Sequence, residues 1–247
     1  MGWGDELMAA GEAMSLGGVV VAIKDKNGNH RWHDAWENNP HIAKVDEKYD
    51  KFIVNAPSAR PYVKNVSPPA WGWKAYRPKA AKFYFSKEEL DEIAFIENNF
   101  IVVEPHLKQK AESVNRDWGW DNFAKVTSSV DADWVQLGAT MPRMLPNARW
   151  IQTPTPRMMA AVMSKARAFL SPEGGMHHTA AALKLKGVVL FGGFVAPQVT
   201  GYTMHKNIFI GNGLGCGKRL KCEHCADAWS KINPERIIKI MAGMANG

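Results

Sequence analysis

The chain has 247 residues, of which 46% are hydrophobic and 22% charged, a composition typical of a globular protein with one large domain or two small ones. No apolar run reaches the roughly 18 residues that a membrane-spanning helix needs, and the acidic N-terminus lacks the basic and apolar regions of a secretory signal peptide. We therefore expect a cytoplasmic protein with no membrane span.

Positive charge is concentrated in the second half of the chain. Residues 1–100 contain 13 Lys and Arg against 14 Asp and Glu, whereas residues 101–247 contain 18 against 10, and the whole chain carries a net charge of +7. A basic half is expected if that half binds a nucleotide diphosphate, although general solubility and nucleic-acid contact are alternatives. The absence of a block of five basic residues makes the nucleic-acid signal weak.

The first half of the sequence predicts few regular elements. A strand is expected at residues 17–23, before the turn-forming sequence Asp-Lys-Asn-Gly, and a second strand at residues 51–55. Residues 57–82 are rich in Pro, Trp and Tyr and predict an irregular loop region. The capping-box order Ser86-Lys-Glu-Glu89 predicts a helix that continues to about residue 98.

Strands and helices alternate from residue 100 onward, which favours a parallel sheet with helices on both faces. Strands are expected at residues 100–104, 134–137, 149–152, 169–170 and 187–193, and helices at residues 120–130, 156–168 and 234–244. The last helix has Asn233 at its N-cap and Pro234 at its first position. The change of pattern places the boundary between the two halves near residues 98–101.

The segment Phe169–Leu183 is the most informative part of the chain, because a short apolar strand passes through a glycine turn into a helix of small residues. The first N–H groups of such a helix are unpaired and its dipole is positive at that end, so the turn can bind an anion. Gly174 and Gly175 lack Cβ atoms and allow a diphosphate to approach the backbone closely. A glycine-capped helix start without a ligand is the alternative interpretation.

The same segment resembles the donor-site motif of glycosyltransferase family 9, the heptosyltransferase-like enzymes, whose pattern is roughly acidic-Ser/Thr-Gly-x-x-His-x-x-Ala-Ala. Glu173, Gly175 and His178 take the acidic, glycine and histidine positions, and the alanine pair follows. Gly174 replaces the usual hydroxyl residue, so one contact of the family is missing. The resemblance implies that this segment holds the sugar and the phosphates of a donor, with His177 as a second polar group or a capping residue.

The resemblance extends over most of residues 100–247. Asn115-Arg-Asp-Trp-Gly-Trp-Asp-Asn-Phe123 matches the family's spacing of a basic residue, a Trp and a Phe. Arg116 takes the place of a lysine that is implied to bind donor phosphate, which an Arg can do bidentately, and a surface charge before a helix is the alternative. Lys108, in the preceding loop, is a further candidate for phosphate binding and is equally compatible with solvent exposure.

The N-terminal segment Gly2–Met8 is similar to the family's Gly-Asp loop, with a helix expected from about residue 6 to residue 15. Asp5 takes the position of the aspartate that the resemblance implies as the catalytic base, which removes a proton from an acceptor hydroxyl. An N-cap aspartate is the alternative role. Family members carry a strand before this loop, whereas the present sequence begins at the loop. Either the first strand is absent, which predicts a reduced N-terminal domain, or the start codon is assigned late.

Loops that follow strands gather at one edge of a doubly wound sheet, where ligands bind. Tyr202 and His205 follow the strand at residues 187–193 and are therefore candidate contacts of the donor or of the base. Sugars stack on aromatic faces, which makes Trp71 and Trp73 candidates as well, although core packing is the commoner role of a single Trp.

All three cysteines, Cys216, Cys222 and Cys225, lie in one segment near the C-terminus, with His224 among them. This spacing is compatible with a structural zinc whose fourth ligand is His224 or His205. Plain or occasionally oxidised thiols are the alternative. Three cysteines cannot all pair, and a cytoplasmic protein keeps its cysteines reduced. The resemblance is to a metal-independent family, so no metal or other cofactor is expected to be required for catalysis.

Together these observations predict an α/β protein with two Rossmann-like domains facing across a cleft, the glycosyltransferase B arrangement, in which the N-terminal domain is reduced. Residues 1–99 are expected to bind the acceptor and residues 100–247 the nucleotide-diphosphate sugar donor. The resemblance implies an inverting, metal-independent glycosyltransferase that acts on an acceptor hydroxyl of a glycan, a lipopolysaccharide or a lipid-linked sugar. The basic second half and the short first half also allow a modified DNA base as the acceptor. The alternative is a catalytically degenerate protein that only binds nucleotide sugars.

Overall fold

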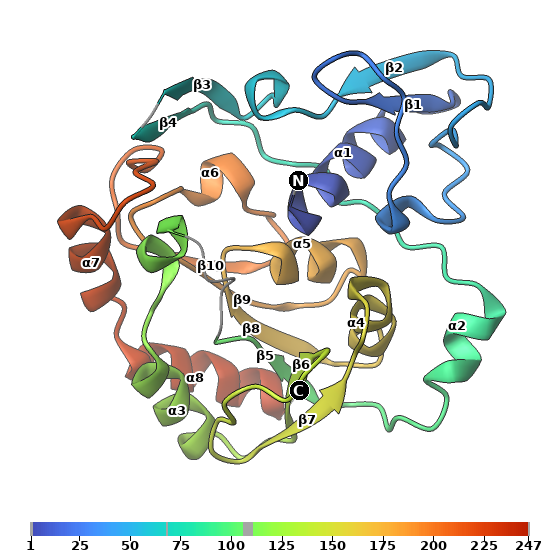
Figure 1. Cartoon of the computed structure of the whole chain (residues 1–247). Coiled ribbons are helices and arrows are strands. Elements are labelled where there is room, and N and C mark those ends of the chain that lie inside the picture. The colour runs from blue at the N-terminus through green and yellow to red at the C-terminus, as the bar shows by residue number, and fades with distance from the viewer. Residues whose placement is uncertain (1, 68, 106–110, 247) are drawn as a thin grey trace.

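The computed structural model describes residues 2–67, 69–105 and 111–246, and within these ranges it contains one large parallel sheet and two small sheets (Figure 1). The large sheet is formed by β5 (Ile101–Val103), β6 (Trp134–Gly138), β7 (Ala148–Gln152), β8 (Ala168–Pro172), β9 (Gly187–Phe191) and β10 (Lys206–Phe209). Their order across the sheet is β7-β6-β5-β8-β9-β10, and every neighbouring pair is parallel. Counted along the chain, this is the order 3-2-1-4-5-6 of the doubly wound dinucleotide-binding folds.

Side chains of the central strands alternate between two hydrophobic cores, one on each face of the sheet. Ile101 and Leu170 belong to the core that also includes side chains of α3 and α8, whereas Val102 and Phe169 belong to the core that includes side chains of α4, α5 and α6. The helices of this half are α3 (Trp120–Ser129), α4 (Pro156–Met163), α5 (Gly175–Ala182), α6 (Pro197–Thr200), α7 (Glu223–Ser230) and α8 (Pro234–Ala245). The alternating pattern of the sequence is therefore confirmed as a parallel sheet with helices on both faces.

Side-chain caps fix where two of these helices begin. Thr155 Oγ1 accepts a hydrogen bond from the Met158 N–H at 3.1 Å, directly before the proline that opens α4. Asn233 Oδ1 accepts from the Glu235 N–H at 2.9 Å, directly before the proline that opens α8. Each cap satisfies a backbone donor that has no partner within the helix, so the predicted N-cap at Asn233 is confirmed.

The first half of the chain carries smaller elements. Its helices and strands are α1 (Trp3–Ser15), β1 (Val21–Lys24), β2 (Lys51–Val54), β3 (Val63–Ser67), β4 (Ala70–Trp73) and α2 (Lys87–Glu92). Short 3-10 helices lie at Asp34–Trp36, Pro57–Ala59 and, in the second half, Ala111–Arg116. β1 and β2 pair in parallel, whereas β3 and β4 form an antiparallel hairpin. A two-stranded parallel sheet beside α1 is a reduced Rossmann-like unit, as the sequence predicted.

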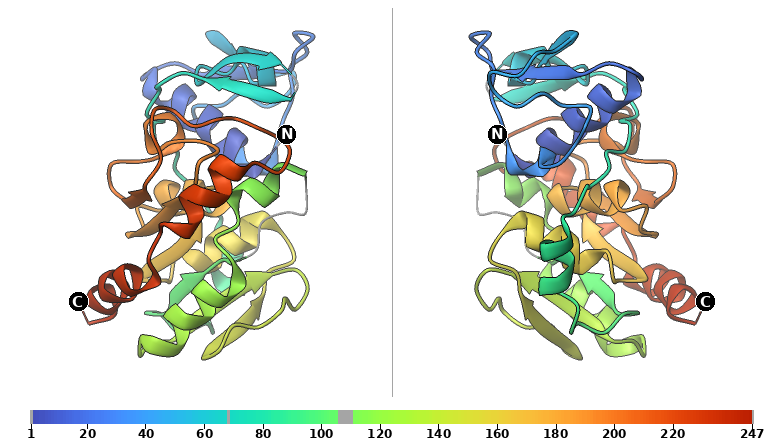
Figure 2. Two further views of the ribbon diagram at one scale, coloured as in Figure 1. Left: turned by 90° about the vertical axis from the view of Figure 1, so that its left-hand side faces the viewer. Right: turned by 90° about the vertical axis from the view of Figure 1, so that its right-hand side faces the viewer.

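β1 to β4 lie at one end of the molecule and α8 lies toward the other (Figure 2). α2, although it belongs to the first half, packs against α4. α1 packs against α5 and so connects the first half to the large sheet. None of the described helices is both long and apolar enough to cross a membrane.

Several sequence expectations differ from the structure. Residues 57–82 are not wholly irregular, because they contain the β3–β4 hairpin. The helix that opens at residue 87 ends at Glu92, since Ile93 and Ile96 turn into the hydrophobic core. The helix that opens at residue 156 ends at Met163, because the chain has already entered β8 by Ala168. β10, α6 and α7 were not expected from the sequence.

Candidate functional site

β5 and β8 are neighbours at the centre of the sheet, and the chain leaves them toward opposite edges. After β5 it continues to β6 and β7, and after β8 it continues to β9 and β10. The loops at the carboxyl ends of β5 and β8 therefore diverge and leave a crevice, which is where open α/β sheets bind ligands. Glu104 directly follows β5 and Glu173 directly follows β8, so two carboxylates lie at the crevice.

A cavity of about 550 Å³ occupies the crevice and falls within the size range of small-ligand sites. Both halves of the chain form its walls. Described residues of its lining include 2–5, Arg60, Tyr62, Trp71 and Trp73 from the first half, and Glu104, Arg116, 172–176, His178 and Phe194 from the second. A ligand in this cavity would touch the reduced N-terminal unit and the large sheet at once.

Two helix N-termini converge on the cavity, those of α1 and α5. A Cβ atom added to Gly175 would lie 3.4 Å from Trp3 Cδ1, and one added to Gly4 would collide with the His178 ring. Trp3 Nε1 donates a hydrogen bond to Thr179 Oγ1 at 2.8 Å, which joins the two helices. Because the positive ends of two helix dipoles border the same space, the cavity favours an anionic ligand.

Arg116 and Glu173 form an ion pair at the cavity wall, with 3.2 Å between Arg116 Nη1 and Glu173 Oε2. The guanidinium carbon of Arg116 also lies 4.4 Å from the centre of the Phe194 ring, a cation–π contact that fixes its position. The ion pair lacks hydrogen-bond geometry, and within the described residues Arg116 Nε and Glu173 Oε2 have no hydrogen-bond partner. The structure thus brings together two residues that the sequence indicated separately.

Asp5 lies in the first turn of α1, because that helix begins at Trp3 rather than at residue 6. Its Oδ1 accepts a hydrogen bond from the Tyr62 hydroxyl at 2.6 Å, and its Oδ2 lies 2.9 Å from Arg60 Nη2. Oδ2 also accepts from the Gly2 N–H at 3.1 Å, so Asp5 caps the helix from inside its first turn and not from the N-cap position. Its side chain is 22% exposed and lines the cavity.

Tyr62 and Arg60 hold the Asp5 carboxylate from the segment that the sequence predicted to be irregular. Burial, and next the charge of Asp5, raise the pKa of Tyr62 well above its ordinary value, so the phenol stays protonated and donates. Arg60 is buried and its Nε also faces Asn55 Oδ1 at 3.4 Å. No sequence signal indicates either residue, because neither lies in a recognisable motif and both reach Asp5 only through the fold.

The two adjacent histidines take different positions. His177 is fully buried, its Nδ1 accepts from the Gly174 N–H at 3.0 Å, and its Nε2 therefore carries the proton that is donated to Thr200 O at 3.0 Å. His178 lines the cavity, and its Nδ1 is 2.9 Å from the Tyr202 hydroxyl. Burial lowers the pKa of both histidines, and that of His178 well below its ordinary value, so both rings are neutral at physiological pH.

Tyr202 and His205 lie behind His178 and are not among the described residues that line the cavity. The ring of His205 packs edge-on against Phe169 at 4.9 Å, and burial lowers its pKa to about 3. Tyr202 contacts His178 through its hydroxyl group and so helps to hold the histidine that lines the cavity. Lys108, the other candidate for phosphate, lies outside the described residues.

The cysteine segment forms a compact group away from the cavity lining. One ligand atom each of Cys216, Cys222, His224 and Cys225 lies within 4.8 Å of the others. The hydrogen bond from the Cys225 thiol lowers the pKa of Cys216 to about 5, and the same contact raises the pKa of Cys225. His205, the alternative fourth ligand, is not part of this group of described residues.

The whole chain aligns with the structure of a glycosyltransferase family 9 protein from Veillonella parvula, at 12% sequence identity over 95% of that chain and a TM-score of 0.68. The fold is that of heptosyltransferase-like glycosyltransferases.

Other solved structures resemble this fold as well. The iron-containing dodecameric glycosyltransferase TibC of enterotoxigenic E. coli aligns with 100% of this chain and 74% of its own, at 12% identity and a TM-score of 0.61. A second structure of TibC, in complex with ADP-D-beta-D-heptose, aligns over 84% of this chain and 64% of its own, at 11% identity and a TM-score of 0.51. The ADP-heptose heptosyltransferase II of E. coli matches at 16% identity and a TM-score of 0.49 over 73% of this chain, which spans only 56% of that enzyme's length. No protein-family model matches the sequence, and the search of curated proteins finds no significant match.

The resemblance predicted from the glycine turn is thus confirmed at the level of the fold. In this heptosyltransferase-like fold the crevice at β5 and β8 belongs to the Rossmann-like sheet, and Asp5 lines it from the N-terminal unit. The start of α1 lies beside α5 (Figure 1).

Proposed function

We propose that this protein is an inverting glycosyltransferase that moves a sugar from a nucleotide-diphosphate donor to an acceptor hydroxyl without a catalytic metal. Residues 100–247 would bind the donor and residues 1–99 the acceptor, in a cytoplasmic protein. The observation that carries the proposal is the single cavity in which two helix N-termini, Arg116 and Glu173 meet Asp5 from the other half.

The diphosphate of the donor is proposed to bind at the N-terminus of α5. Gly174 and Gly175 leave its backbone accessible, and Arg116 supplies the neighbouring positive charge. Glu173 and His178 border the same space and would bind the hydroxyls of the sugar, with His178 neutral and oriented by Tyr202. The structure of TibC with ADP-D-beta-D-heptose supports a nucleotide-diphosphate sugar as the class of donor.

The proposed reaction is a single displacement at the anomeric carbon. The acceptor oxygen attacks as Asp5 takes its proton, a carbon–oxygen bond forms, and the bond from the anomeric carbon to the diphosphate breaks on the opposite side. The departing diphosphate keeps the electron pair, and the two helix N-termini with Arg116 stabilise its charge. Attack from the side opposite the leaving group inverts the anomeric centre. These fixed positive groups supply the stabilisation that other glycosyltransferases take from a metal.

The acceptor is proposed to be a glycan or a lipid-linked or lipopolysaccharide sugar. Trp71 and Trp73 of β4 line the cavity from the half of the chain that also supplies Asp5. Their rings pack against each other at 5.7 Å and form an aromatic surface on which the face of a sugar would stack. A modified DNA base remains the other acceptor class, supported by the basic charge of residues 101–247.

A second candidate function is binding of nucleotide sugars without transfer. It is favoured by the three donors on Asp5, because Arg60, Tyr62 and Gly2 occupy the carboxylate that must accept a proton. In a working transferase the acceptor would have to displace one of these contacts or use the exposed edge of the carboxylate.

Release of the nucleoside diphosphate, measured with a coupled assay over a panel of nucleotide sugars and sugar acceptors, tests the proposal. An enzyme should release nucleoside diphosphate in an acceptor-dependent way, and Asp5→Asn should remove this activity. A protein that binds donors tightly but releases none, with any acceptor of the panel, would fit the second candidate instead.

A further inference from the structure

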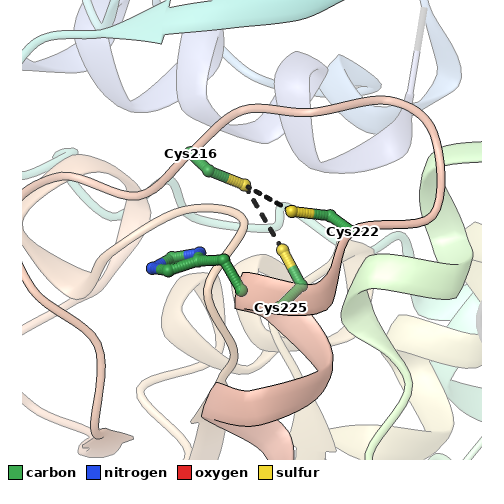
Figure 3. Close-up of side chains that lie close together, drawn as sticks. Cys216, Cys222 and Cys225 are labelled. Carbon is green, nitrogen blue, oxygen red and sulfur yellow. Dashed lines mark hydrogen bonds between the residues drawn. The ribbon is translucent and has the colours of Figure 1, made fainter.

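Three sulfur atoms and one imidazole meet where the loop after β10 runs into α7. Cys216 lies in the loop, Cys222 is the residue before α7, and Cys225 lies in the first turn of that helix. Figure 3 shows the three thiol groups pointing toward one another. Cys216 Sγ is 3.3 Å from Cys225 Sγ and 4.0 Å from Cys222 Sγ.

These separations match the edges of a tetrahedral metal site. With zinc–sulfur bonds of about 2.3 Å, two thiolates of a tetrahedron lie about 3.8 Å apart, between the two measured distances. A disulfide needs its sulfurs about 2.05 Å apart, and all three cysteines are free in this structure. Pairing two of them would also leave the third thiol alone.

The surrounding backbone is built to hold these ligands. The Lys218 N–H lies 3.5 Å from Cys216 Sγ and donates to it, and Gly217 between them has a φ of 62°, which a residue with a side chain rarely adopts. Cys222 and Cys225 sit at the N-terminus of α7, whose dipole favours thiolates.

Space for the fourth ligand comes from a glycine. A Cβ atom on Gly193 would lie 2.6 Å from His224 Nδ1, so this position must lack a side chain for the imidazole to lie where it does. Cys222 and Cys225 are buried, whereas His224 is exposed and closes the group from the solvent side.

We propose that Cys216, Cys222 and Cys225 bind a Zn²⁺ ion as thiolates, with His224 as the fourth ligand. Three sulfurs and one nitrogen, each within 4.8 Å of the others, form a donor set that suits zinc. With four protein ligands the site would be closed and structural. The role is separate from the donor cavity, since none of the four residues is among the described residues that line it.

The ion would stabilise the contact between the loop that contains Cys216, in the second half of the chain, and the β3–β4 hairpin of the first half. Next to Cys216, the Gly217 carbonyl accepts from the Trp71 N–H at 3.0 Å, and the Gly217 N–H donates to Phe194 O at 2.9 Å. Lys218 forms an isolated antiparallel bridge with Ala70 of the β3–β4 hairpin. The metal would therefore fix the wall of the cavity that contains Trp71 and Phe194, without touching the ligand.

Metal content of the full chain, purified under reducing conditions and measured by mass spectrometry of the elements, tests the site. About one zinc per chain is expected, with loss of zinc in Cys216→Ser and in Cys225→Ser. Lys221→Ala, an exposed change in the same loop, serves as the matched control and should keep the metal. His224→Ala should bind zinc more weakly in competition with a chromophoric chelator.

A spectroscopic readout covers the case in which the serine variants do not fold. Replacement of zinc by Co²⁺ in the wild-type chain should give thiolate-to-cobalt charge-transfer absorption and the intense visible bands of tetrahedral cobalt. Chelation should lower the Tm, and added Zn²⁺ should restore it. Reduced protein that binds neither metal, zinc that persists in Cys216→Ser, or a disulfide between two of the cysteines would overturn the proposal.

Discussion

At the scale of single residues, the candidate site depends on partners that lie far apart in the sequence. Asp5 contacts Arg60 and Tyr62, and Arg116 contacts Glu173, across 55 residues or more in each case. The sequence identified Asp5, Arg116 and Glu173 through local motifs, because each stands in a recognisable pattern. It could not identify Arg60 or Tyr62, since no local spacing indicates that a loop residue will meet a helix start.

Asp5→Asn should lower the rate of transfer by roughly 10²–10⁴-fold, the usual contribution of a general base. Donor binding should change little, because the amide keeps the shape of the carboxylate at the cavity wall. The measurement pairs nucleoside diphosphate release with the donor-induced shift in Tm. Tyr62→Phe is the companion variant, because it removes one hydrogen bond to Asp5 and leaves the base in place. Equal rates for Asp5→Asn and the wild type would remove Asp5 from the mechanism.

Buried histidines should make the protein less stable in mild acid. Burial lowers the pKa of His205 to about 3, so in the folded state it stays neutral where the unfolded chain, with a pKa near 6.5, binds a proton. The unfolded state then gains protons, and the free energy of unfolding falls as pH drops from 6.5 toward 3. Between pH 7.5 and pH 5.5, the free energy of unfolding should therefore fall by about 1.4 kcal/mol less in His205→Phe than in the wild type. Denaturant melts at pH 7.5 and pH 5.5 measure it, and an unchanged pH difference would contradict the assignment.

At the scale of elements, glycines decide how closely two helix starts approach. Gly4 of α1 lies against the ring of His178 of α5 with no room for a Cβ atom, whereas Gly175 has ordinary contacts with Trp3. The sequence predicted the glycine turn before α5, because strand, turn and helix follow one another there. It did not predict that α1 would come to lie beside that turn, which depends on the packing of α1 against α5.

Gly4→Ala should destabilise the protein by about 1–3 kcal/mol through overpacking against His178, and it should weaken donor binding as that ring moves. Gly243→Ala is the matched control, because Gly243 lies in α8 with nothing within 4 Å of an added Cβ atom. This control should stabilise the helix by about 0.5–1 kcal/mol. Chemical denaturation measures both, and a Gly4→Ala protein as stable as the wild type would show that the helices can separate freely.

The missed elements have local physical reasons. β10 covers only Lys206–Phe209 at the edge of the sheet, so it lacks the buried run that identifies β8 and β9. The β3–β4 hairpin is rich in half-buried tryptophans, and Trp73 Nε1 donates to Phe194 O at 2.9 Å from a strand that packs on a loop. All four residues of β4 are half-buried, so the strand lacks the alternation of buried and exposed positions that identifies a strand with one face in the core.

At the scale of the whole molecule, the order of the six strands decides where a ligand binds. The alternation of strands and helices predicts a parallel sheet, but only the order β7-β6-β5-β8-β9-β10 places the crevice between β5 and β8. The positive charge of residues 101–247 then lies on the same half as the crevice. Fold, charge and helix dipoles all favour an anionic ligand at that place.

The charge distribution also yields a test of the DNA alternative. If a modified DNA base were the acceptor, duplex DNA should bind tightly at physiological salt, with an affinity that falls steeply as more salt is added, because phosphate contacts release counterions. With a glycan acceptor we expect weak DNA binding that is lost at physiological salt. Fluorescence anisotropy with a labelled duplex across a salt series measures this, and tight binding at physiological salt would favour the DNA acceptor.

The central claim is that the crevice binds a nucleotide-diphosphate sugar, and a thermal-shift titration with such donors tests it most directly. We predict that at least one donor raises the Tm in a concentration-dependent way, more than its parent nucleotide does. Arg116→Ala should weaken this donor about tenfold or more, since it removes a charged partner of the diphosphate. The exposed Arg236→Ala on α8 should leave donor binding unchanged. If no donor shifts the Tm, or if both variants respond as the wild type does, the crevice is not a donor site.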